Sequence, residues 1–467
     1  MQLKQYQERV VNEVRVYLDA LAKELADGNT RHAGKDAWEA CDIPRRYRSE
    51  RRNGINLDLP TFCIKVPTGG GKTLLATQIL GLIHKTILKN HRGTGLVLWV
   101  VPSDQIYKDT LKALRDRRHF YRESLEFALS RRIEVWEKHE IARLTPGQLA
   151  SNLNVLIIKL QGTNRQDRES LKFFHDSGGN IVGHFPPEDE PEQHKALKER
   201  IPNLDMIEED DDSGAYLAKT SIANLVRMCE PAVILDEGHK ATSTLARETI
   251  EGFNPRIVVE LSATPCEANV LVTVSGQELL DEEMIKLPIN IANSNQKSWK
   301  NVLTAARDRR AELHKLAEKH YRASDRAQDP VRPIVLVQVE RTGRDQREAR
   351  FVHSEDVKEH LIQRLGVDER KIAIKTAEKD DIEGIDLVDS ECPVEWIITK
   401  AALQEGWDCP FAYILVSLNN TQSQRSMTQL VGRILRQPYQ QRTPYDDLNE
   451  SYVYCLNRKS KDVVAEV

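Results

Sequence analysis

Short, continuous apolar runs alternate with amphipathic segments along the first part of the chain. Apolar residues recur at helical spacing between residues 3 and 25, and a second helix is predicted at 74–88. Apolar runs predict buried strands at 61–66, 96–101, 154–160, 232–235 and 257–261. Because buried strands separated by helices are typical of a parallel sheet covered on both faces, the sequence predicts the α/β class.

A second series of the same kind follows. A helix is predicted at 302–323, and strands at 333–339, 372–374, 395–399 and 413–416. A chain of 467 residues is too long for one hydrophobic core. We therefore expect an N-terminal domain at 1–285, a linker at 286–300 and a C-terminal domain at 301–467, each with a parallel sheet flanked by helices.

Two segments interrupt the alternation of predicted strands and helices in the N-terminal domain. Residues 30–58 are rich in arginine and predict an irregular insertion. Residues 165–218 contain HFPPEDEPEQH and IEEDDDSG, which predict a solvated acidic surface insertion. Such a segment buries too little apolar surface to offset the entropy lost on ordering. The acidic insertion is a candidate for docking a partner.

Composition narrows the classes of protein. With 40% hydrophobic and 30% charged residues, the chain is typical of a globular protein, and no apolar run approaches the roughly 20 residues that cross a bilayer. The seven cysteines form no CxxC pair, which argues against a zinc site or disulfide framework and predicts a cytoplasmic location. Because the net charge is −4, nucleic-acid binding would need a local basic face, for which residues 45–52 and 115–119 are candidates.

The segment PTGGGKT at residues 67–73 follows a predicted strand and precedes a predicted helix. Glycines in this position let backbone N–H groups close around phosphate oxygens at a helix N-terminus. Lys72 is expected to reach the β- and γ-phosphates of ATP, and Thr73 to place its hydroxyl on Mg²⁺. Val66 stands where the full pattern has Gly or Ala. The expected nucleotide-binding residues of this loop are Thr68, Gly69, Gly70, Gly71, Lys72 and Thr73.

Two carboxylates follow the predicted strand at 232–235, in the tetrapeptide DEGH. We assign Asp236 to Mg²⁺, directly or through water, and Glu237 to the proton of the attacking water. His239 is expected to couple this segment to LSATP at 261–265 by hydrogen bonding.

The segment QLVGRILR at 429–436 carries Arg433 and Arg436. Their spacing places them on one face of a predicted helix. Paired guanidinium groups stabilise charge that develops on a transferring phosphoryl group. We therefore expect both to sense the γ-phosphate, with Gln429 beside them.

In this order the segments resemble the superfamily 2 helicases and translocases over nearly the whole chain. The resemblance implies two tandem RecA-like domains of the P-loop NTPase fold, with ATP between them. The segments LKQYQ, VVPSDQI, LSATP, PIVLVQVE, TKAALQEGWDCPFAYIL and QLVGRILR are similar to the motifs of that superfamily.

The resemblance also implies individual roles. Gln7 would contact adenine, and Gly406 and Asp408 would contribute to the nucleotide site. Contacts to the nucleic-acid backbone are expected from Ser103, Gln161 and Thr399, largely without sequence preference.

Within the superfamily, RPIVLVQVE, LQEGWDCPFAYIL and QLVGRILRQP look most like the Res subunit of type III restriction enzymes. The implied activity is a DNA-dependent ATPase motor with ATP and Mg²⁺, in a restriction or related anti-phage system. A nuclease or methyltransferase subunit is a candidate partner. No PD-(D/E)xK constellation is found and EWIITK is interpreted as a strand, so nuclease activity is not predicted for these residues. DEGH departs from the commoner DEAH, without expected effect on metal or water.

Two other classes of function remain open at this stage. ATP could act as a switch in a module that recruits partners without moving a strand. The motor motifs discriminate poorly between the sugars of DNA and RNA, so an RNA helicase or remodeller is the third hypothesis.

Overall fold

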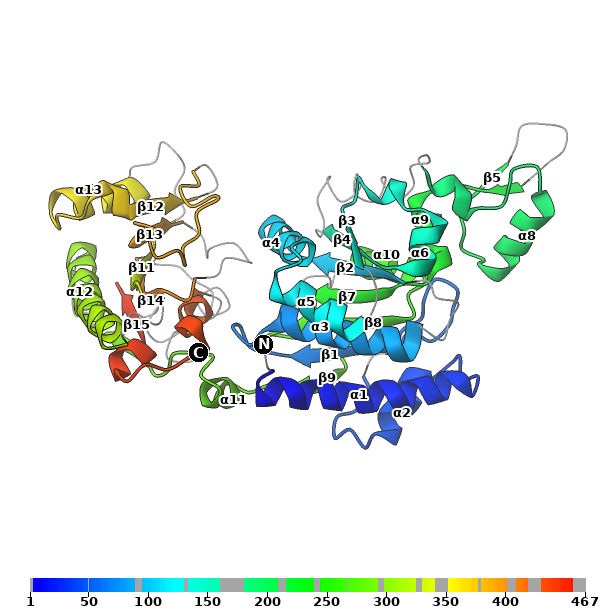
Figure 1. Cartoon of the computed structure of the whole chain (residues 1–467), viewed down its shortest axis with the longest axis horizontal. Coiled ribbons are helices and arrows are strands. Elements are labelled where there is room, and N and C mark those ends of the chain that lie inside the picture. The colour runs from blue at the N-terminus through cyan, green and yellow to red at the C-terminus, as the bar shows by residue number, and fades with distance from the viewer. Residues whose placement is uncertain are drawn as a thin grey trace. The chain divides into compact units, whose positions relative to one another are not determined.

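The computed structural model describes two compact units, one of residues 1–67 and 71–275, the other of residues 68–70 and 276–467 (Figure 1). It describes residues 3–48, 50–88, 95–129, 133–159, 180–208, 216–238, 244–266, 268–292, 298–324, 330–340, 352–376, 379–400, 409–418 and 430–456. Within these ranges, the helices are too short or too polar to cross a membrane.

The first unit is built on a seven-stranded sheet in the order β3-β4-β2-β7-β8-β1-β9. Every pair in it is parallel. The strands are β1 (Thr61–Lys65), β2 (Leu96–Val101), β3 (Ile133–Trp136), β4 (Leu153–Lys159), β7 (Ala232–Asp236), β8 (Ile257–Ser262) and β9 (Val270–Thr273). The five predicted strands are confirmed, and the edge strands β3 and β9 are additional.

Helices cover this sheet. They are α1 (Gln5–Ala26), α3 (Lys72–Ile83), α4 (Asp104–Arg115), α5 (Phe120–Leu129), α6 (Pro146–Ser151), α9 (Ile222–Cys229) and α10 (Thr244–Gly252). The predicted helix at 74–88 corresponds to α3 and the π-helix His84–Leu88 that continues it. A Cβ at Gly81 would lie 2.7 Å from the Cβ of Ala128, so the glycine permits the close packing of α3 on α5.

The irregular conformation predicted for residues 30–58 is wrong in part, because this segment contains the helix α2 (Ala33–Ala40). Its Trp38 side chain is buried and meets Tyr17 of α1 edge-on, with ring centroids 5.8 Å apart. Because charged residues surround Trp38 in the sequence, the short apolar face of α2 is not evident from the hydrophobic pattern. The segment is therefore a packed part of the first unit, beside α1 (Figure 1).

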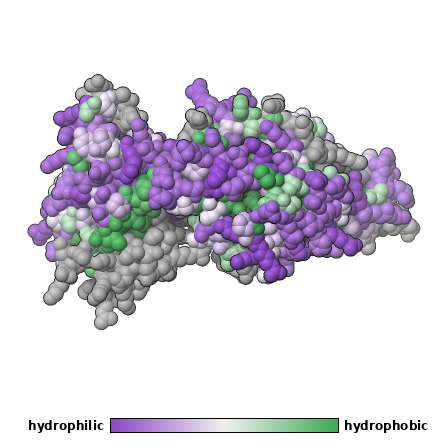
Figure 2. All heavy atoms as spheres, turned by 90° about the horizontal axis from the view of Figure 1, so that it is seen from below, coloured by the Kyte–Doolittle hydropathy of each residue, from purple (hydrophilic) through white to green (hydrophobic). Residues whose placement is uncertain are grey.

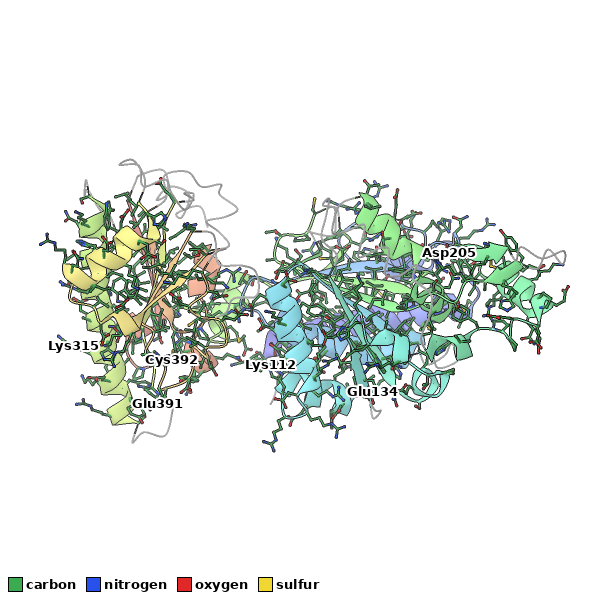
Figure 3. All side chains as sticks on the ribbon, turned by 90° about the horizontal axis from the view of Figure 1, so that it is seen from above. Lys112, Glu134, Asp205, Lys315, Glu391 and Cys392 are labelled. Atoms are coloured by element: carbon green, nitrogen blue, oxygen red, sulfur yellow. The ribbon has the colours of Figure 1, made fainter. Side chains whose placement is uncertain are left out.

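The prediction of a solvated loop is also wrong for the described part of residues 165–218. The helix α8 (Pro191–Arg200) packs with an antiparallel pair, β5 (Met206–Glu208) and β6 (Tyr216–Ala218). Leu197, Ile201 and Leu204 are buried in a hydrophobic cluster of the first unit. Asp205 joins this segment to α9, because its carboxylate lies 2.9 Å from Arg227 (Figure 3 labels Asp205).

The second unit is built on a six-stranded sheet in the order β10-β15-β14-β11-β13-β12, again with every pair parallel. The strands are β10 (Ile289–Ala292), β11 (Ile334–Gln338), β12 (Ile372–Lys375), β13 (Trp396–Thr399), β14 (Ala412–Ser417) and β15 (Ser451–Cys455). Helices of this unit include α11 (Gly276–Asp281), α12 (Trp299–Ala323) and α13 (Ser354–Gln363). The four predicted strands and the helix at 302–323 are confirmed.

Strand β10 lies in the segment predicted as a linker. It pairs with β15 from Ile289 to Ala292, so these residues belong to the second sheet. Its partner β15 comes more than 150 residues later in the chain, and no local sequence pattern indicates that the two strands pair. The α/β class with parallel sheets flanked by helices is confirmed in both units. The face drawn in Figure 2 is mainly hydrophilic, as the share of charged residues predicts.

Candidate nucleotide-binding site

The loop between β1 and α3 has the backbone geometry of an anion site. Gly69 and Gly71 have φ values of 89° and 71°, in the left-handed region that side chains disfavour. Gly71 is the N-cap of α3, whose first residue is Lys72. The free N–H groups and the dipole of a helix N-terminus favour negative charge. The structure therefore places the predicted phosphate loop at the start of a twelve-residue helix.

Lys72 and Glu237 meet at this loop. The Nζ of Lys72 lies 2.6 Å from Oε1 of Glu237, and both side chains are mostly buried. Asp236 is the last residue of β7, and Thr73 is the second residue of α3. Because the ends of parallel strands meet at one edge of the sheet, the two predicted segments come together although more than 150 residues separate them.

The turn that carries Glu237 is unusual. Its φ is 52°, a left-handed conformation uncommon for a residue with a side chain. Such conformations persist where the surrounding structure imposes them, and they concentrate at functional sites. The conformation of this turn is what directs the Glu237 carboxylate to Lys72.

Gly238, the departure from DEAH, has a steric cause. A Cβ at this position would lie 3.1 Å from both the Cβ and Oε2 of Glu260 in β8. An alanine would therefore require the Glu260 side chain to shift. Sequence reasoning missed Glu260, although a carboxylate inside the apolar run IVVEL is the signal that points to it.

Glu260 is a mostly buried acid with arginine neighbours. Burial raises the pKa of its carboxyl, and the charges of Arg51 and Arg247 oppose that shift. The Nη1 of Arg51 lies 3.7 Å from Glu260, and its Nε lies 2.7 Å from Glu251. Because of these two ion pairs, Arg51, a residue of the basic segment 45–52, neutralises carboxylates inside the first unit.

The second basic segment, residues 115–119, also contains an arginine that is paired with carboxylates. Arg115 pairs with Glu137 at 2.9 Å and with Glu140. The charge of this arginine is therefore balanced at the C-terminal end of α4. A role of residues 115–119 in nucleic-acid binding stays a prediction.

Gln7 lies beside the phosphate loop. It is buried, with Oε1 accepting from the Lys4 backbone N–H at 3.0 Å and Nε2 donating to the Tyr6 hydroxyl at 3.1 Å. A Cβ built on Gly71 would lie 3.0 Å from Nε2 of Gln7. The first turn of α1 thus brings the amide predicted to contact adenine to the loop predicted to bind phosphate. Tyr6 is a neighbour that the motif did not single out.

Two of the residues predicted to contact nucleic acid have structural partners. Ser103 is the N-cap of α4, and its Oγ accepts from the Ile106 N–H at 3.3 Å. Thr399 ends β13 and is buried. Their contact with nucleic acid stays a prediction. Outside the described residues lie His239, Gln161, Gly406, Asp408 and Gln429.

The shared helix face predicted for Arg433 and Arg436 is wrong. Residues 430–434 are helical and include Arg433, whereas Arg436 forms an isolated antiparallel bridge with Ile285. The Gln437 N–H donates to the Met284 carbonyl at 3.0 Å, and the Lys286 N–H donates to Leu435. Pairing with residues 284–286 therefore takes the chain out of the helix before Arg436.

Comparison with known proteins identifies one family. Residues 1–267 match the family described as "Type III restriction enzyme, res subunit". This is more than half of the 467 residues. The comparison with curated proteins found no match.

Several solved structures resemble the chain weakly. The DNA-bound Type ISP restriction-modification enzyme LlaBIII is 12% identical with a TM-score of 0.46, over 97% of this chain and 27% of that one. A fragment of a putative HsdR subunit from Vibrio vulnificus YJ016 is 14% identical with a TM-score of 0.39, over 85% and 68%. The helicase Lhr of Mycobacterium smegmatis, bound to single-stranded DNA and AMP-PNP, is 16% identical with a TM-score of 0.43, over 96% and 49%. The chain thus spans about a quarter of the length of LlaBIII.

Proposed function

The chain belongs to the family of type III restriction enzyme Res subunits, and from this premise we propose that it is a DNA-dependent ATPase that works as a helicase or translocase motor. One observation carries the proposal. Lys72, at the N-terminus of α3, is paired at 2.6 Å with Glu237, which follows β7. A phosphate-binding lysine and a carboxylate that handles water are two of the groups that nucleotide hydrolysis uses.

ATP would be held from two sides. Backbone N–H groups of the loop and the Lys72 ammonium would bind its phosphates. The Gln7 amide, buried next to Gly71, would hydrogen-bond the base. Adenine recognition by an amide of fixed orientation favours one base over another, because an unmatched partner leaves a buried polar group unpaired.

The residues present also fit Mg²⁺. A hydroxyl at the second position of α3 and a carboxylate at the end of β7 are the oxygen ligands that this ion prefers. Thr73 and Asp236 would hold it. When bound, the ion would neutralise charge on the phosphate oxygens.

Glu237 would accept the proton of the attacking water. In the structure described here its carboxylate is held by Lys72. The phosphates of ATP would compete for that ammonium and leave the carboxylate available. We further propose that Arg433 and Arg436 stabilise charge on the γ-phosphate during turnover.

DNA would be the nucleic acid, in a restriction or related anti-phage system. Family membership supports this assignment. A nuclease or methyltransferase subunit remains the proposed partner, and Ser103 and Thr399 remain proposed contacts to the DNA backbone.

Steady-state ATP hydrolysis tests the proposal. Turnover would be measured without nucleic acid and with single-stranded DNA, duplex DNA or RNA, with Lys72→Ala as the inactive control. Stimulation by DNA is the expected result. Stimulation by RNA alone would assign the protein to the RNA remodellers. Equal turnover in all four conditions would favour an ATP-switched recruitment module.

A further inference from the structure

Lys286 is a fully buried lysine in the second unit, just before β10. Its Nζ donates to three backbone carbonyls, those of Pro410 at 2.9 Å, Ala412 at 3.2 Å and Arg436 at 2.5 Å. The same ammonium lies 4.1 Å from the centroid of the Tyr413 ring. No carboxylate pairs with Lys286 among the described residues.

The three acceptors come from two separate parts of the chain. Ala412 is the first residue of β14 and Pro410 lies just before this strand, whereas Arg436 follows the helical residues 430–434. The residues around Lys286 also hold Arg436 through the main chain. Ile285 forms a bridge with Arg436, and the Lys286 N–H donates to Leu435 at 2.5 Å. The backbone of Arg436 is thus fixed on two sides by one short segment.

We propose that Lys286 is a positioning residue for Arg436, which it anchors to the start of β14 through the three carbonyl groups. This inference rests on the proposed role of Arg436 in ATP turnover. An arginine side chain is long, so the precision with which it meets a phosphate depends on how firmly its backbone is held.

The chemistry of the amine supports this role. An ammonium group has three N–H donors and matches three carbonyls, whereas a neutral amine has two donors and a lone pair. Burial lowers the pKa of Lys286 to about 7. Above this pH one carbonyl loses its donor, and the anchor of Arg436 loosens.

The groups that face Lys286 do not titrate in the same range. Burial raises the pKa of the Cys409 thiol to about 11. Burial also raises the pKa of the Tyr413 hydroxyl well above its ordinary value. Arg332 lies nearby, with its guanidinium over the Phe411 ring at 5.6 Å from the centroid.

A double-mutant cycle tests the proposal, with DNA-stimulated ATP turnover as the readout. Lys286→Met should lower kcat about tenfold, the effect of losing a charged hydrogen bond, with little change in KM. Adding Lys286→Met to Arg436→Ala should cost nothing further, because the anchored side chain is already gone. Lys315→Met, on the exposed face of α12, is the matched control (Figure 3 labels Lys315).

The outcomes separate the two proposals. Unchanged turnover in Arg436→Ala would overturn the role of Arg436 itself. A large loss in Arg436→Ala with none in Lys286→Met, or additive losses, would overturn only the positioning role. Should Lys286→Met fail to fold, the pH profile of the wild-type chain decides. Its kcat should fall as the pH rises through about 7, and the residual turnover of Arg436→Ala should lack that fall.

Discussion

Lys72 and Glu237 form a 2.6 Å ion pair between the first residue of α3 and the residue after β7. Each is the other's charge partner at a place where both are largely shielded from water. A phosphate that binds the loop would compete for Lys72 and leave Glu237 without its cation. With the proposed roles of the two residues, the pair would couple nucleotide binding to the availability of the base.

Glu237→Gln should separate binding from hydrolysis. The amide keeps the size of the side chain but cannot accept the proton of water, so ATP turnover should fall by about two to four orders of magnitude. ATP binding should be retained, since Lys72 loses a competitor for its charge. Turnover and equilibrium binding of a fluorescent ATP analogue would be measured together, with Glu248→Gln on the exposed face of α10 as the control. Turnover near that of the wild type would refute the role of Glu237.

Lys72→Ala should abolish turnover and weaken ATP binding, because the variant lacks the cation for the phosphates. The fold should survive, although the Glu237 carboxylate loses its partner in a largely buried position. Circular dichroism and thermal unfolding would establish that the variant is folded. Lys23→Ala, exposed on α1, changes the same residue type away from the loop. Ordinary ATP hydrolysis by folded Lys72→Ala would remove the site assignment.

The glycine-rich loop before α3 and the central strands could be predicted from the sequence because each depends on neighbouring residues. LVLWVV is apolar at every position and TFCIKV at four of its six positions. Glycines 69 and 71 adopt the positive φ values that only their residue type favours. Local composition suffices for such features.

Features that depend on distant partners could not be predicted in this way. Arg436 leaves the expected helix because Ile285, about 150 residues earlier, pairs with it. The contact of Glu260 with Gly238 arises because β8 lies next to β7. Trp38 is buried because α1 presents Tyr17 to it. Each of these needs the register of two elements, which no short segment contains.

Gly238→Ala should destabilise the first unit. The new Cβ would lie 3.1 Å from the Cβ and Oε2 of Glu260, a contact that forces a shift in a packed region. We expect a loss of about 1–3 kcal/mol in the free energy of unfolding, as for other overpacked sites. Chemical denaturation measures it, with Gly252→Ala as the control, since an added Cβ there meets nothing within 4 Å.

A second substitution tests the steric cause. Glu260→Ala removes Oε2 and Cγ but leaves its own Cβ, so it should relieve the Gly238→Ala clash in part. The double variant should therefore lose less stability than the sum of the two single losses. Strict additivity would show that Glu260 does not determine the glycine at position 238.

The stability of the second unit should increase with pH above neutrality because of Lys286. Its pKa is lowered to about 7 in the folded chain, from an ordinary value of 10.5. Between these values the unfolded chain binds a proton that the folded chain does not, so the free energy of unfolding rises with pH across this window. Below about pH 7 both states are protonated, and Lys286 contributes no pH dependence.

Denaturation midpoints of wild-type and Lys286→Met chains would be compared at successive pH values. The wild type should gain stability relative to Lys286→Met as the pH rises, whereas Lys315→Met should follow the wild type throughout. A constant difference between wild type and Lys286→Met would mean that the ammonium keeps its ordinary pKa despite its burial.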